Sequence, residues 1–262
     1  MSPGTGSGGR RVAVITGASS GIGEALARQL SAAGWFCVLV ARREERLREL
    51  SAALGGEYEV CDVSDREAVG RAAAAIVARH PAVHLLVNNA GIPGRATFIT
   101  ATPEQIDAVT GVNYLGGVWM LRALLPALER ATPSSVVNVA SVAGTVAVPT
   151  SGPYSASKSA QIAFSRAVCA ELKPTGIKVL TVMPGFVETE GFPQRGFLPG
   201  LMSKAVVDPD YIAKKILKGV ASGRRELITP GWYRLATIGQ WLMPWLVYRI
   251  VSTRFMLSRD SF

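Results

Sequence analysis

Short apolar runs rich in β-branched residues alternate with stretches of helical length along most of the chain. Seven such runs predict strands: Val12–Thr16, Phe36–Ala41, Tyr58–Val63, His84–Asn88, Ser135–Ala140, Lys178–Met183 and Glu226–Thr229. Strands that are apolar throughout, with helices between them, are typical of a parallel sheet covered on both faces. The pattern therefore predicts an α/β fold, a doubly wound parallel sheet of about seven strands.

Polar residues at two positions predict where helices begin. Ser64 with Glu67 has the spacing of a capping box, and so has Thr102 with Gln105, where Pro103 occupies the first helical position. No linker, charge run or repeat divides the sequence. We expect a flexible tail at 1–10, one domain at 11–230 and a C-terminal extension at 231–262.

Composition excludes several classes of protein. With 48% hydrophobic and 18% charged residues in 262, the chain is too apolar to be disordered. Its three cysteines (Cys37, Cys61 and Cys169) are far apart in apolar runs, which favours core packing over disulfides or zinc. His80 and His84 flank Pro81 without an acidic cluster, so no metal site is expected. The Gly/Ser-rich start lacks the apolar stretch of a signal peptide, and we expect a cytoplasmic protein.

Positive charge is concentrated in the last quarter of the chain. From Leu201 onward the sequence contains ten basic and four acidic residues, and the whole chain has a net charge of +9. Such a face could attract anionic lipid, a phosphorylated substrate or nucleic acid, or be an ordinary solvated surface. No nucleic-acid-binding module is present in the sequence, so specific nucleic-acid binding is not expected.

A glycine-rich turn follows the first predicted strand. Gly17, Gly21 and Gly23 lie between that strand and a helical run from Glu24 to Ala33. Glycines allow a sharp turn and a close approach of the backbone, and the start of the helix offers N–H groups to a pyrophosphate. The turn therefore predicts a Rossmann-like dinucleotide site.

The motif Thr-Gly-x-x-x-Gly-x-Gly resembles that of the short-chain dehydrogenase/reductase family, and further family motifs follow in order over roughly residues 11–230. They are Asn88-Asn89-Ala90-Gly91 after the fourth strand, a helical Asn113, Ser141 after the fifth strand, Tyr154-x-x-x-Lys158 in the next helix, and Pro184, Gly185 and Thr189 after the sixth strand. The resemblance implies an oxidoreductase with Asn113, Ser141, Tyr154 and Lys158 as catalytic residues. It implies a cofactor site formed by Gly17, Ser19, Ser20, Gly21, Ile22, Gly23, Arg42, Asp62, Val63, Asn89, Ala90, Gly91, Tyr154, Lys158, Pro184, Gly185, Val187 and Thr189.

The chemistry of a carbonyl reduction explains why these residue types are needed. Negative charge that develops on the carbonyl oxygen must be hydrogen-bonded and then protonated, and a tyrosine can do both. Because a phenol titrates near pH ~10, a nearby cation such as Lys158, one helical turn away, is expected to lower its pKa. Ser141 would orient the substrate oxygen, and the resemblance implies that Asn113 holds a water that relays protons to Lys158.

Spacing alone does not single out Tyr154. Tyr211 and Lys215 have the same separation, but no serine at a strand end precedes them, so Tyr211 is predicted to be a partly buried helix residue.

Cofactor preference is predicted from the end of the second strand. NAD-binding proteins carry an acid there for the ribose 2′-hydroxyl, whereas this chain has Ala41 followed by Arg42 and Arg43. We expect NADP(H) to be preferred over NAD(H). If the arginines only pair with Glu45 or Glu49, NAD would remain acceptable.

The loop after the sixth strand predicts the substrate class. Between 184 and 204 it contains apolar residues hinged by glycines: Phe186, Val187, Phe192, Pro193, Phe197, Leu198, Pro199, Leu201 and Met202, with Gly185, Gly191, Gly196 and Gly200. Further apolar wall is expected from Ile92, Pro93, Val142, Val146 and Val148. A mobile lid over a lipid-like, terpenoid or aromatic ketone or secondary alcohol is predicted. The alternatives are a 3-oxoacyl-thioester reductase and a non-catalytic dinucleotide-binding sensor or scaffold.

The extension after Pro230 departs from the common single-domain members of the family. Leu235 to Tyr248 is fourteen residues without a formal charge, with Trp241, Trp245 and an interrupting Pro244, which is too short to span a bilayer. Three hypotheses remain: a helix in a membrane interface, a cover over the pocket or a subunit contact, and an ordinary packed tail. By resemblance we also expect a homodimer or homotetramer built through the helices that carry Asn113 and Tyr154.

Overall fold

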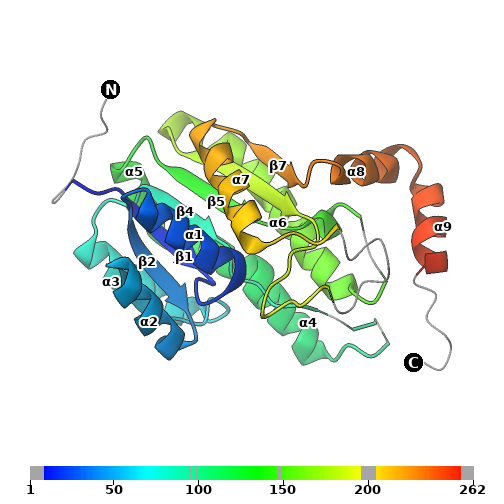
Figure 1. Cartoon of the computed structure of the whole chain (residues 1–262), viewed down its shortest axis with the longest axis horizontal. Coiled ribbons are helices and arrows are strands. Elements are labelled where there is room, and N and C mark those ends of the chain that lie inside the picture. The colour runs from blue at the N-terminus through cyan, green and yellow to red at the C-terminus, as the bar shows by residue number, and fades with distance from the viewer. Residues whose placement is uncertain (1–8, 95, 98, 147–148, 196–204, 255–262) are drawn as a thin grey trace.

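Seven parallel strands form one sheet at the centre of the molecule (Figure 1). The computed structural model describes residues 9–94, 96–97, 99–146, 149–195 and 205–254, with side chains described to residue 250. The order along the sheet is β3-β2-β1-β4-β5-β6-β7. The strands are β1 (Val12–Thr16), β2 (Phe36–Ala41), β3 (Glu57–Val60), β4 (Leu85–Asn88), β5 (Ser135–Val139), β6 (Lys178–Pro184) and β7 (Glu226–Thr229). The order runs outward from β1 in both directions, which confirms the predicted doubly wound α/β fold.

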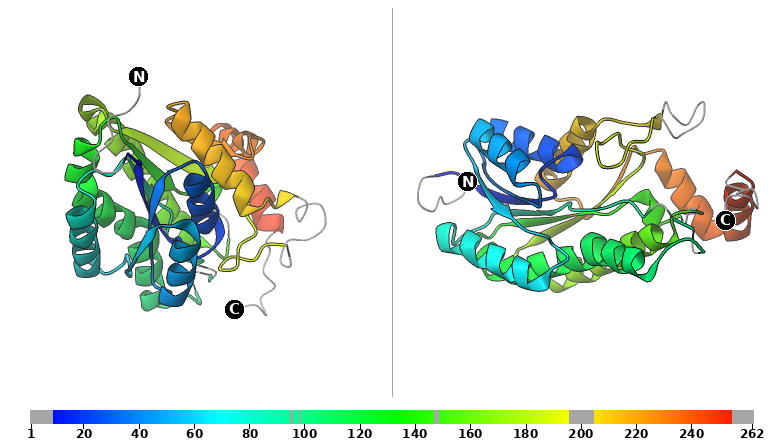
Figure 2. Two further views of the ribbon diagram at one scale, coloured as in Figure 1. Left: turned by 60° about the vertical axis from the view of Figure 1, so that its left-hand side comes forward. Right: turned by 90° about the horizontal axis from the view of Figure 1, so that it is seen from below.

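Helices cover both faces of the sheet (Figure 2). One face is covered by α1 (Gly21–Ala32), α2 (Glu44–Leu54) and α7 (Pro209–Ala221), and the other by α3 (Arg66–Arg79), α5 (Gly116–Arg130) and α6 (Gly152–Glu171). The remaining helical segments are α4 (Pro103–Thr110), the π-helical turn η1 (Gly111–Leu115), the short 3-10 turns η2 (Val142–Gly144) and η3 (Lys173–Thr175), α8 (Tyr233–Leu242) and α9 (Pro244–Arg254). Figures 1 and 2 show α8 and α9 beyond the end of the sheet toward which the strands run.

Alternation of side chains in the strands divides the core in two. In β1, Ala13 and Ile15 pack with α1, α2 and α7, whereas Val12 and Val14 pack with α3 and α5. All four are buried. Because both faces of each central strand are buried, successive residues are all apolar, which is why these strands stand out in the sequence.

One of the two predicted helix caps is wrong. Thr102 and Gln105 form the expected capping box with Pro103 at the helix start. At α3, however, Asp65 is the N-cap, and its carboxylate accepts hydrogen bonds from the backbone N–H groups of Glu67 and Ala68. Ser64 instead donates both its N–H and its hydroxyl to Asp62. An Asx turn at Asp62 thus displaces the start of the helix by one residue.

Candidate functional site

A cavity of about 1040 Å³ opens at the carboxyl edge of the sheet. Its walls come from the ends of β1, β2, β4, β5 and β6, from the start of α6 and from one side of α8. Most of the residues predicted for the site line it: Gly17, Ser19, Ser20, Gly21, Ile22, Arg42, Asp62, Val63, Asn89, Ala90, Gly91, Ser141, Tyr154, Lys158, Pro184, Gly185, Val187 and Thr189. Gly23 and Asn113 are not among the residues that line it.

The glycine-rich turn has the geometry that a dinucleotide needs. Gly17 has a φ of +65°, and a Cβ there would lie 2.8 Å from the Cα of Ala90. A Cβ at Gly23 would overlap the carbonyl of Gly17, so Gly23 closes the turn from behind. Within the described chain, the side chain of the N-cap residue Ser20 makes no capping hydrogen bond at α1. Because Ser20, Gly21 and Ile22 at its start line the cavity, the positive end of this 12-residue helix faces the cavity, which fits a pyrophosphate.

Hydrogen bonds fasten this turn to the end of β4. The hydroxyl of Thr16 accepts from the backbone N–H groups of Asn89 (3.0 Å) and Ala90 (3.1 Å) and donates to the carbonyl of Val87 (3.2 Å). The side-chain amide of Asn89 donates back to the carbonyls of Thr16 (3.0 Å) and Gly17 (3.3 Å). The two turns that would contact the cofactor are thus held as one unit.

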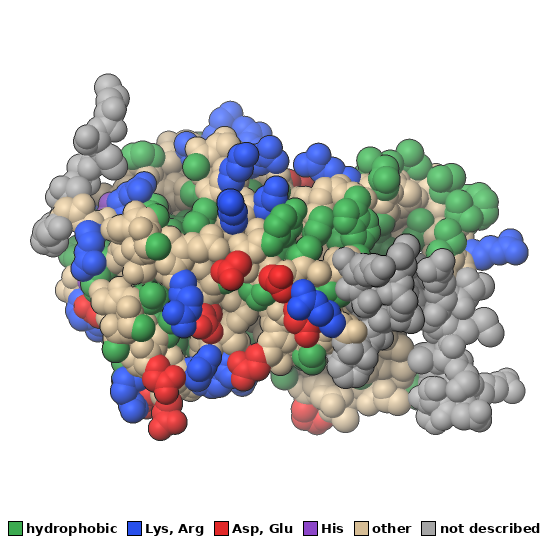
Figure 3. Space-filling model, viewed as in Figure 1, with side chains coloured by type: hydrophobic (Ala, Val, Ile, Leu, Met, Phe, Trp, Pro, Cys, Tyr) green, Lys and Arg blue, Asp and Glu red, His purple; other side chains and the backbone are tan. Residues whose placement is uncertain are grey.

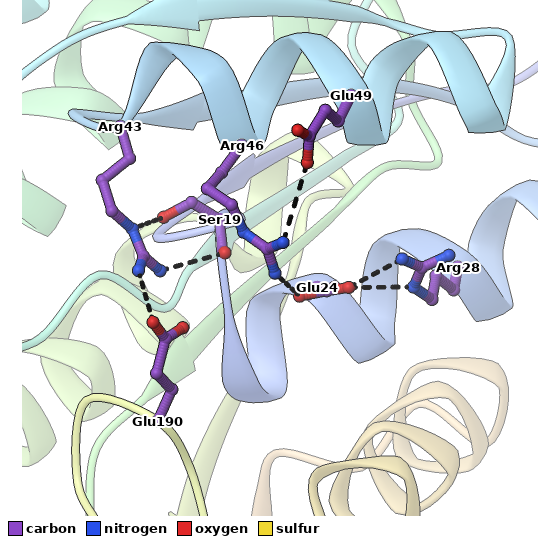
Figure 4. Close-up of polar contacts among 7 residues, drawn as sticks. All are labelled: Ser19, Glu24, Arg28, Arg43, Arg46, Glu49 and Glu190. Atoms are coloured by element: carbon purple, nitrogen blue, oxygen red, sulfur yellow. Dashed lines mark hydrogen bonds and ion pairs between the residues drawn. The ribbon is translucent and has the colours of Figure 1, made fainter.

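Arg43, which was not among the predicted site residues, also lines the cavity, and Figure 4 shows its side chain directed toward Ser19 and Glu190. Its Nε donates to the hydroxyl of Ser19 (3.2 Å) and its Nη2 to the carbonyl of Ser19 (3.0 Å). Its Nη1 lies 3.0 Å from the carboxylate of Glu190. In the sequence, the only indication that Arg43 belongs to the site was its position next to Arg42.

Arg42 also lines the cavity but faces Asp62, at 3.5 Å. Burial would raise the pKa of Asp62, but hydrogen bonds from Ser64 and the nearby Arg42 outweigh it and hold the pKa below its usual value. In the described ion pairs neither Arg42 nor Arg43 pairs with Glu45 or Glu49; it is Arg46 that contacts Glu49 (3.7 Å) and Glu24 (3.6 Å).

Ser141, Tyr154 and Lys158 meet in the middle of the cavity. Ser141 follows β5 as the N-cap of η2, and its hydroxyl lies near enough to Tyr154 to lower the pKa of that phenol. Lys158, one turn along α6, is buried with its Nζ 5.9 Å from the centre of the Tyr154 ring. Its amine donates to the carbonyl of Val139 (2.9 Å) and to Oε1 of Gln161 (3.0 Å). Gln161 was not predicted, although it lies on the same helical face as Lys158, three residues on.

The pKa of Tyr154 differs from the sequence-based expectation. Burial raises it, and the hydrogen bond with Ser141 offsets only part of the rise. Burial also lowers the pKa of Lys158, to about 7, so its amine is only partly charged near neutral pH. A phenol that stays protonated at neutral pH can donate a proton to a reacting oxygen.

Asn113 lies behind the cavity, in the π-helical turn η1. Its Oδ1 accepts from the N–H of Ile92 (2.8 Å), and its Nδ2 donates to the carbonyl of Ile92 (3.1 Å) and to the hydroxyl of Ser157 (3.2 Å). Gly91 separates it from Lys158: a Cβ at Gly91 would lie 3.4 Å from Asn113 Oδ1 and 3.7 Å from Lys158 Nζ. Asn113 therefore holds the turn after β4, and its water relay stays a prediction.

The end of the cavity near Tyr154 is apolar. The ring of Phe192 stacks on Tyr154 with the ring centres 5.8 Å apart, and the further apolar wall consists of Ile92, Pro93, Val142, Val146 and Phe186. Val148 and the loop residues Gly196, Phe197, Leu198, Pro199, Gly200, Leu201 and Met202 lie outside the described residues.

The C-terminal extension contributes to this wall through α8. Tyr233, Ala236 and Thr237 line the cavity. The hydroxyl of Tyr233 accepts a hydrogen bond from the N–H of Phe186 (3.2 Å), and its ring packs so closely on Gly185 that any Cβ there would overlap it. A cover over the pocket was one of the three hypotheses for the extension, and one side of α8 does line the cavity.

The other candidate residues lie outside the cavity. Tyr211 is on α7, 39% exposed and absent from the cavity lining. Cys37 and Cys61 are buried, and burial raises the pKa of each thiol to about 11. Within the described residues no three His, Cys, Asp or Glu side chains gather as metal ligands.

Comparison with known proteins agrees with the geometry. The family model for short chain dehydrogenases matches residues 11–196. This chain belongs to the short-chain dehydrogenase/reductase family. It is 36% identical to dehydrogenase/reductase SDR family member 7B of Xenopus laevis, over 93% of this chain and 81% of that protein.

Solved short-chain dehydrogenases and reductases share the fold. The structure of an actinorhodin polyketide ketoreductase variant with NADPH matches 87% of this chain and 98% of its own, with 31% identity and a TM-score of 0.77. A short-chain dehydrogenase/reductase from Burkholderia phymatum in complex with NAD matches 90% and 95%, with 26% identity and a TM-score of 0.80. As a member of this family the chain is an oxidoreductase acting with a nicotinamide dinucleotide, and its relatives include proteins solved with either cofactor.

Proposed function

We propose that this protein is an NADP(H)-dependent oxidoreductase that interconverts an apolar ketone and the corresponding secondary alcohol. The observation that carries the proposal is the meeting of Ser141, Tyr154 and Lys158 in one cavity, between the glycine-rich turn and an apolar wall. A sensor or scaffold would need the turn but not these three side chains.

Each of the three side chains has a task in carbonyl reduction. The glycine-rich turn and the start of α1 would hold the dinucleotide, which would supply the hydride that the carbonyl carbon accepts. The hydroxyl of Ser141 orients the carbonyl oxygen, and the hydroxyl of Tyr154 hydrogen-bonds the oxygen and then gives it a proton. Lys158 lies beneath the tyrosine and stabilises the phenolate left behind, to the extent that its amine is charged.

The preference for NADP(H) is supported by charge at the end of β2. Ala41 offers no carboxylate to repel a 2′-phosphate, and the guanidinium groups of Arg42 and Arg43 line the same end of the cavity. A guanidinium presents paired donors that match a phosphate.

The apolar substrate class is supported by the opposite end of the cavity. Phe192 stacks on Tyr154 there, and Phe186 and Val142 also line the cavity, whereas the arginines of the described lining, Arg42 and Arg43, lie at the dinucleotide end. Binding of an apolar substrate against such a wall is favoured by about 25 cal/mol for each Å² of apolar surface that is removed from water.

A titration followed by a turnover assay tests the proposal. NADPH and NADH are titrated by fluorescence, and NADPH oxidation is then followed with apolar ketones, aldehydes and 3-oxoacyl thioesters. We expect tighter binding of NADPH and turnover of an apolar ketone. Turnover confined to 3-oxoacyl thioesters would show that these, and not apolar ketones, are the substrates. Binding of the dinucleotide without turnover of any carbonyl compound would favour a dinucleotide-binding sensor. Equal affinity for both dinucleotides would contradict the cofactor preference.

We further propose a homodimer or homotetramer in the cytoplasm, assembled through η1, α5 and α6. Free cysteines at all three positions are consistent with a reducing compartment. Size-exclusion chromatography with light scattering measures the mass, and a monomer would contradict the assembly.

A further inference from the structure

The two C-terminal helices expose an apolar surface that is unusual for a folded protein. Trp241 is 83% exposed, Tyr248 75% and Leu235 74%. The surface, which we call the α8–α9 face, consists of Trp232, Leu235, Ile238, Trp241, Leu242, Met243, Trp245 and Tyr248. Figure 3 shows apolar side chains gathered over these two helices. Contiguous exposed apolar residues of this kind mark an interaction site.

The opposite side of α8 belongs to the candidate active site. Tyr233 and Thr237 line the cavity, and the hydroxyl of Thr237 lies 3.2 Å from that of Thr145, next to η2. A single helix thus separates the apolar end of the cavity from the α8–α9 face. Whatever covers this face lies next to the place where substrate would enter.

The charge of the segment indicates an anionic occupant. Between Leu227 and Arg254 the sequence contains three arginines and no acidic residue. In addition, α7 exposes Lys214, Lys215 and Lys218. Figure 3 shows basic side chains on the same face of the molecule as the apolar ones. A symmetric contact with a second copy would bring two such segments together without an acidic partner from either. Anionic lipid headgroups would complement the charge.

We propose that the α8–α9 face binds the surface of an anionic lipid bilayer, and that apolar substrate passes from the bilayer into the cavity behind α8. Tryptophan and tyrosine favour the level of the headgroups, where their rings are buried and their polar atoms stay hydrated. None of the described helices is long and apolar enough to cross a bilayer, so the contact is with the surface. The proposal of bilayer binding depends only on the exposed residues and charge of the α8–α9 face. The proposal of substrate entry from the bilayer rests in addition on the proposed function.

Vesicle flotation of the full chain tests the binding step. The wild-type protein is expected to float with phosphatidylcholine vesicles that contain 30% phosphatidylserine, and less with phosphatidylcholine alone or in high salt. Trp241→Ser combined with Trp245→Ser should lower the apparent partition coefficient about tenfold or more. Tyr211→Ser, which removes an exposed aromatic ring from α7, is the matched control and should float like the wild type. Unchanged NADPH binding and circular dichroism show that the variants are folded.

Three results would overturn the binding step. They are wild-type protein that stays with the soluble fraction, a double tryptophan variant that floats as well as the wild type, and a wild-type dimer that the double variant converts to monomer without any flotation. The last result would assign the face to a second copy of the chain.

Substrate entry needs an assay of its own. For a ketone dissolved in the vesicles, the double variant should lose at least severalfold in rate, while its rate with a water-soluble ketone stays unchanged. Equal loss with both ketones would contradict entry from the bilayer. Tyr154→Phe should still float while it fails to turn over, so failure of the proposed chemistry and failure of membrane binding are distinguishable.

Discussion

The guanidinium of Arg43 joins Ser19 in the glycine-rich turn to Glu190 in the segment after β6, with Nη1 3.0 Å from the Glu190 carboxylate. This contact links the dinucleotide end of the cavity to the loop that carries Phe192. A 2′-phosphate placed beside Ser19 would compete with Glu190 for the same cation.

Glu190→Gln is therefore expected to tighten NADPH binding. The gain should be only about two- to fivefold, because the Glu190 side chain is 62% exposed and such pairs are screened by solvent. NADH affinity should not change, and fluorescence titration measures both. An equal change for the two dinucleotides would show that Glu190 acts elsewhere.

Arg43→Gln should have the opposite effect. Loss of a charge-assisted hydrogen bond to phosphate is expected to weaken NADPH binding by about 10- to 100-fold and to leave NADH nearly unaffected. Arg42→Gln is the matched comparison, and a larger loss there would assign the phosphate contact to Arg42 instead.

Tyr154→Phe should abolish most turnover while leaving the NADPH dissociation constant within about twofold of the wild type. Removal of a positioned proton donor costs about 10²- to 10⁴-fold in kcat. Tyr211→Phe, at the second Tyr-x-x-x-Lys spacing, should be fully active. Steady-state kinetics with both variants decide the point, and retained activity in Tyr154→Phe would exclude the acid role.

Stability should depend on pH through Lys158. Burial lowers the pKa of Lys158 from 10.5 to about 7, so between these values the unfolded chain binds more protons than the folded one. The free energy of unfolding should then rise with pH from about 7 toward 10, with a slope of up to about 1.4 kcal/mol per pH unit from this group. Urea titrations across this range are compared with those of Lys158→Met. A variant with the same slope as the wild type would contradict the lowered pKa.

Thr16→Val should destabilise the fold by about 2–4 kcal/mol, because it removes a buried hydroxyl that serves two N–H donors and one carbonyl. Thr16→Ser keeps the hydroxyl and should retain most of that stability. Thermal unfolding with and without NADPH measures both, and a Val variant as stable as the Ser variant would show that the hydroxyl contributes little.

Most of the fold was predictable because buried parallel strands leave a simple signal. Six of the seven strands lie within one residue of the predicted bounds, and the strand beginning at Glu57 ends three residues early. The N-cap of α3 was harder to predict from the sequence, since Ser64 and Asp65 are both good N-cap residues and only the Asx turn at Asp62 decides between them.

The candidate site was predictable where residues follow strand ends in a fixed order. The contacts of Arg43, Gln161 and Tyr233 were not, because they join segments far apart in sequence or depend on the direction of a side chain. The pKa of Tyr154 also depends on burial, which spacing does not report.

The contact between Gly185 and Tyr233 has a consequence for engineering. Residues 11–196 carry the family match and the three candidate catalytic side chains, whereas part of the cavity wall comes from α8, outside that range. The substrate preference could therefore be altered by grafting a different C-terminal segment onto the same catalytic body. Such a chimera would need an aromatic ring that fits at position 233 and a glycine at position 185. A Cβ atom at position 185 would overlap the ring at position 233 and displace the grafted helix.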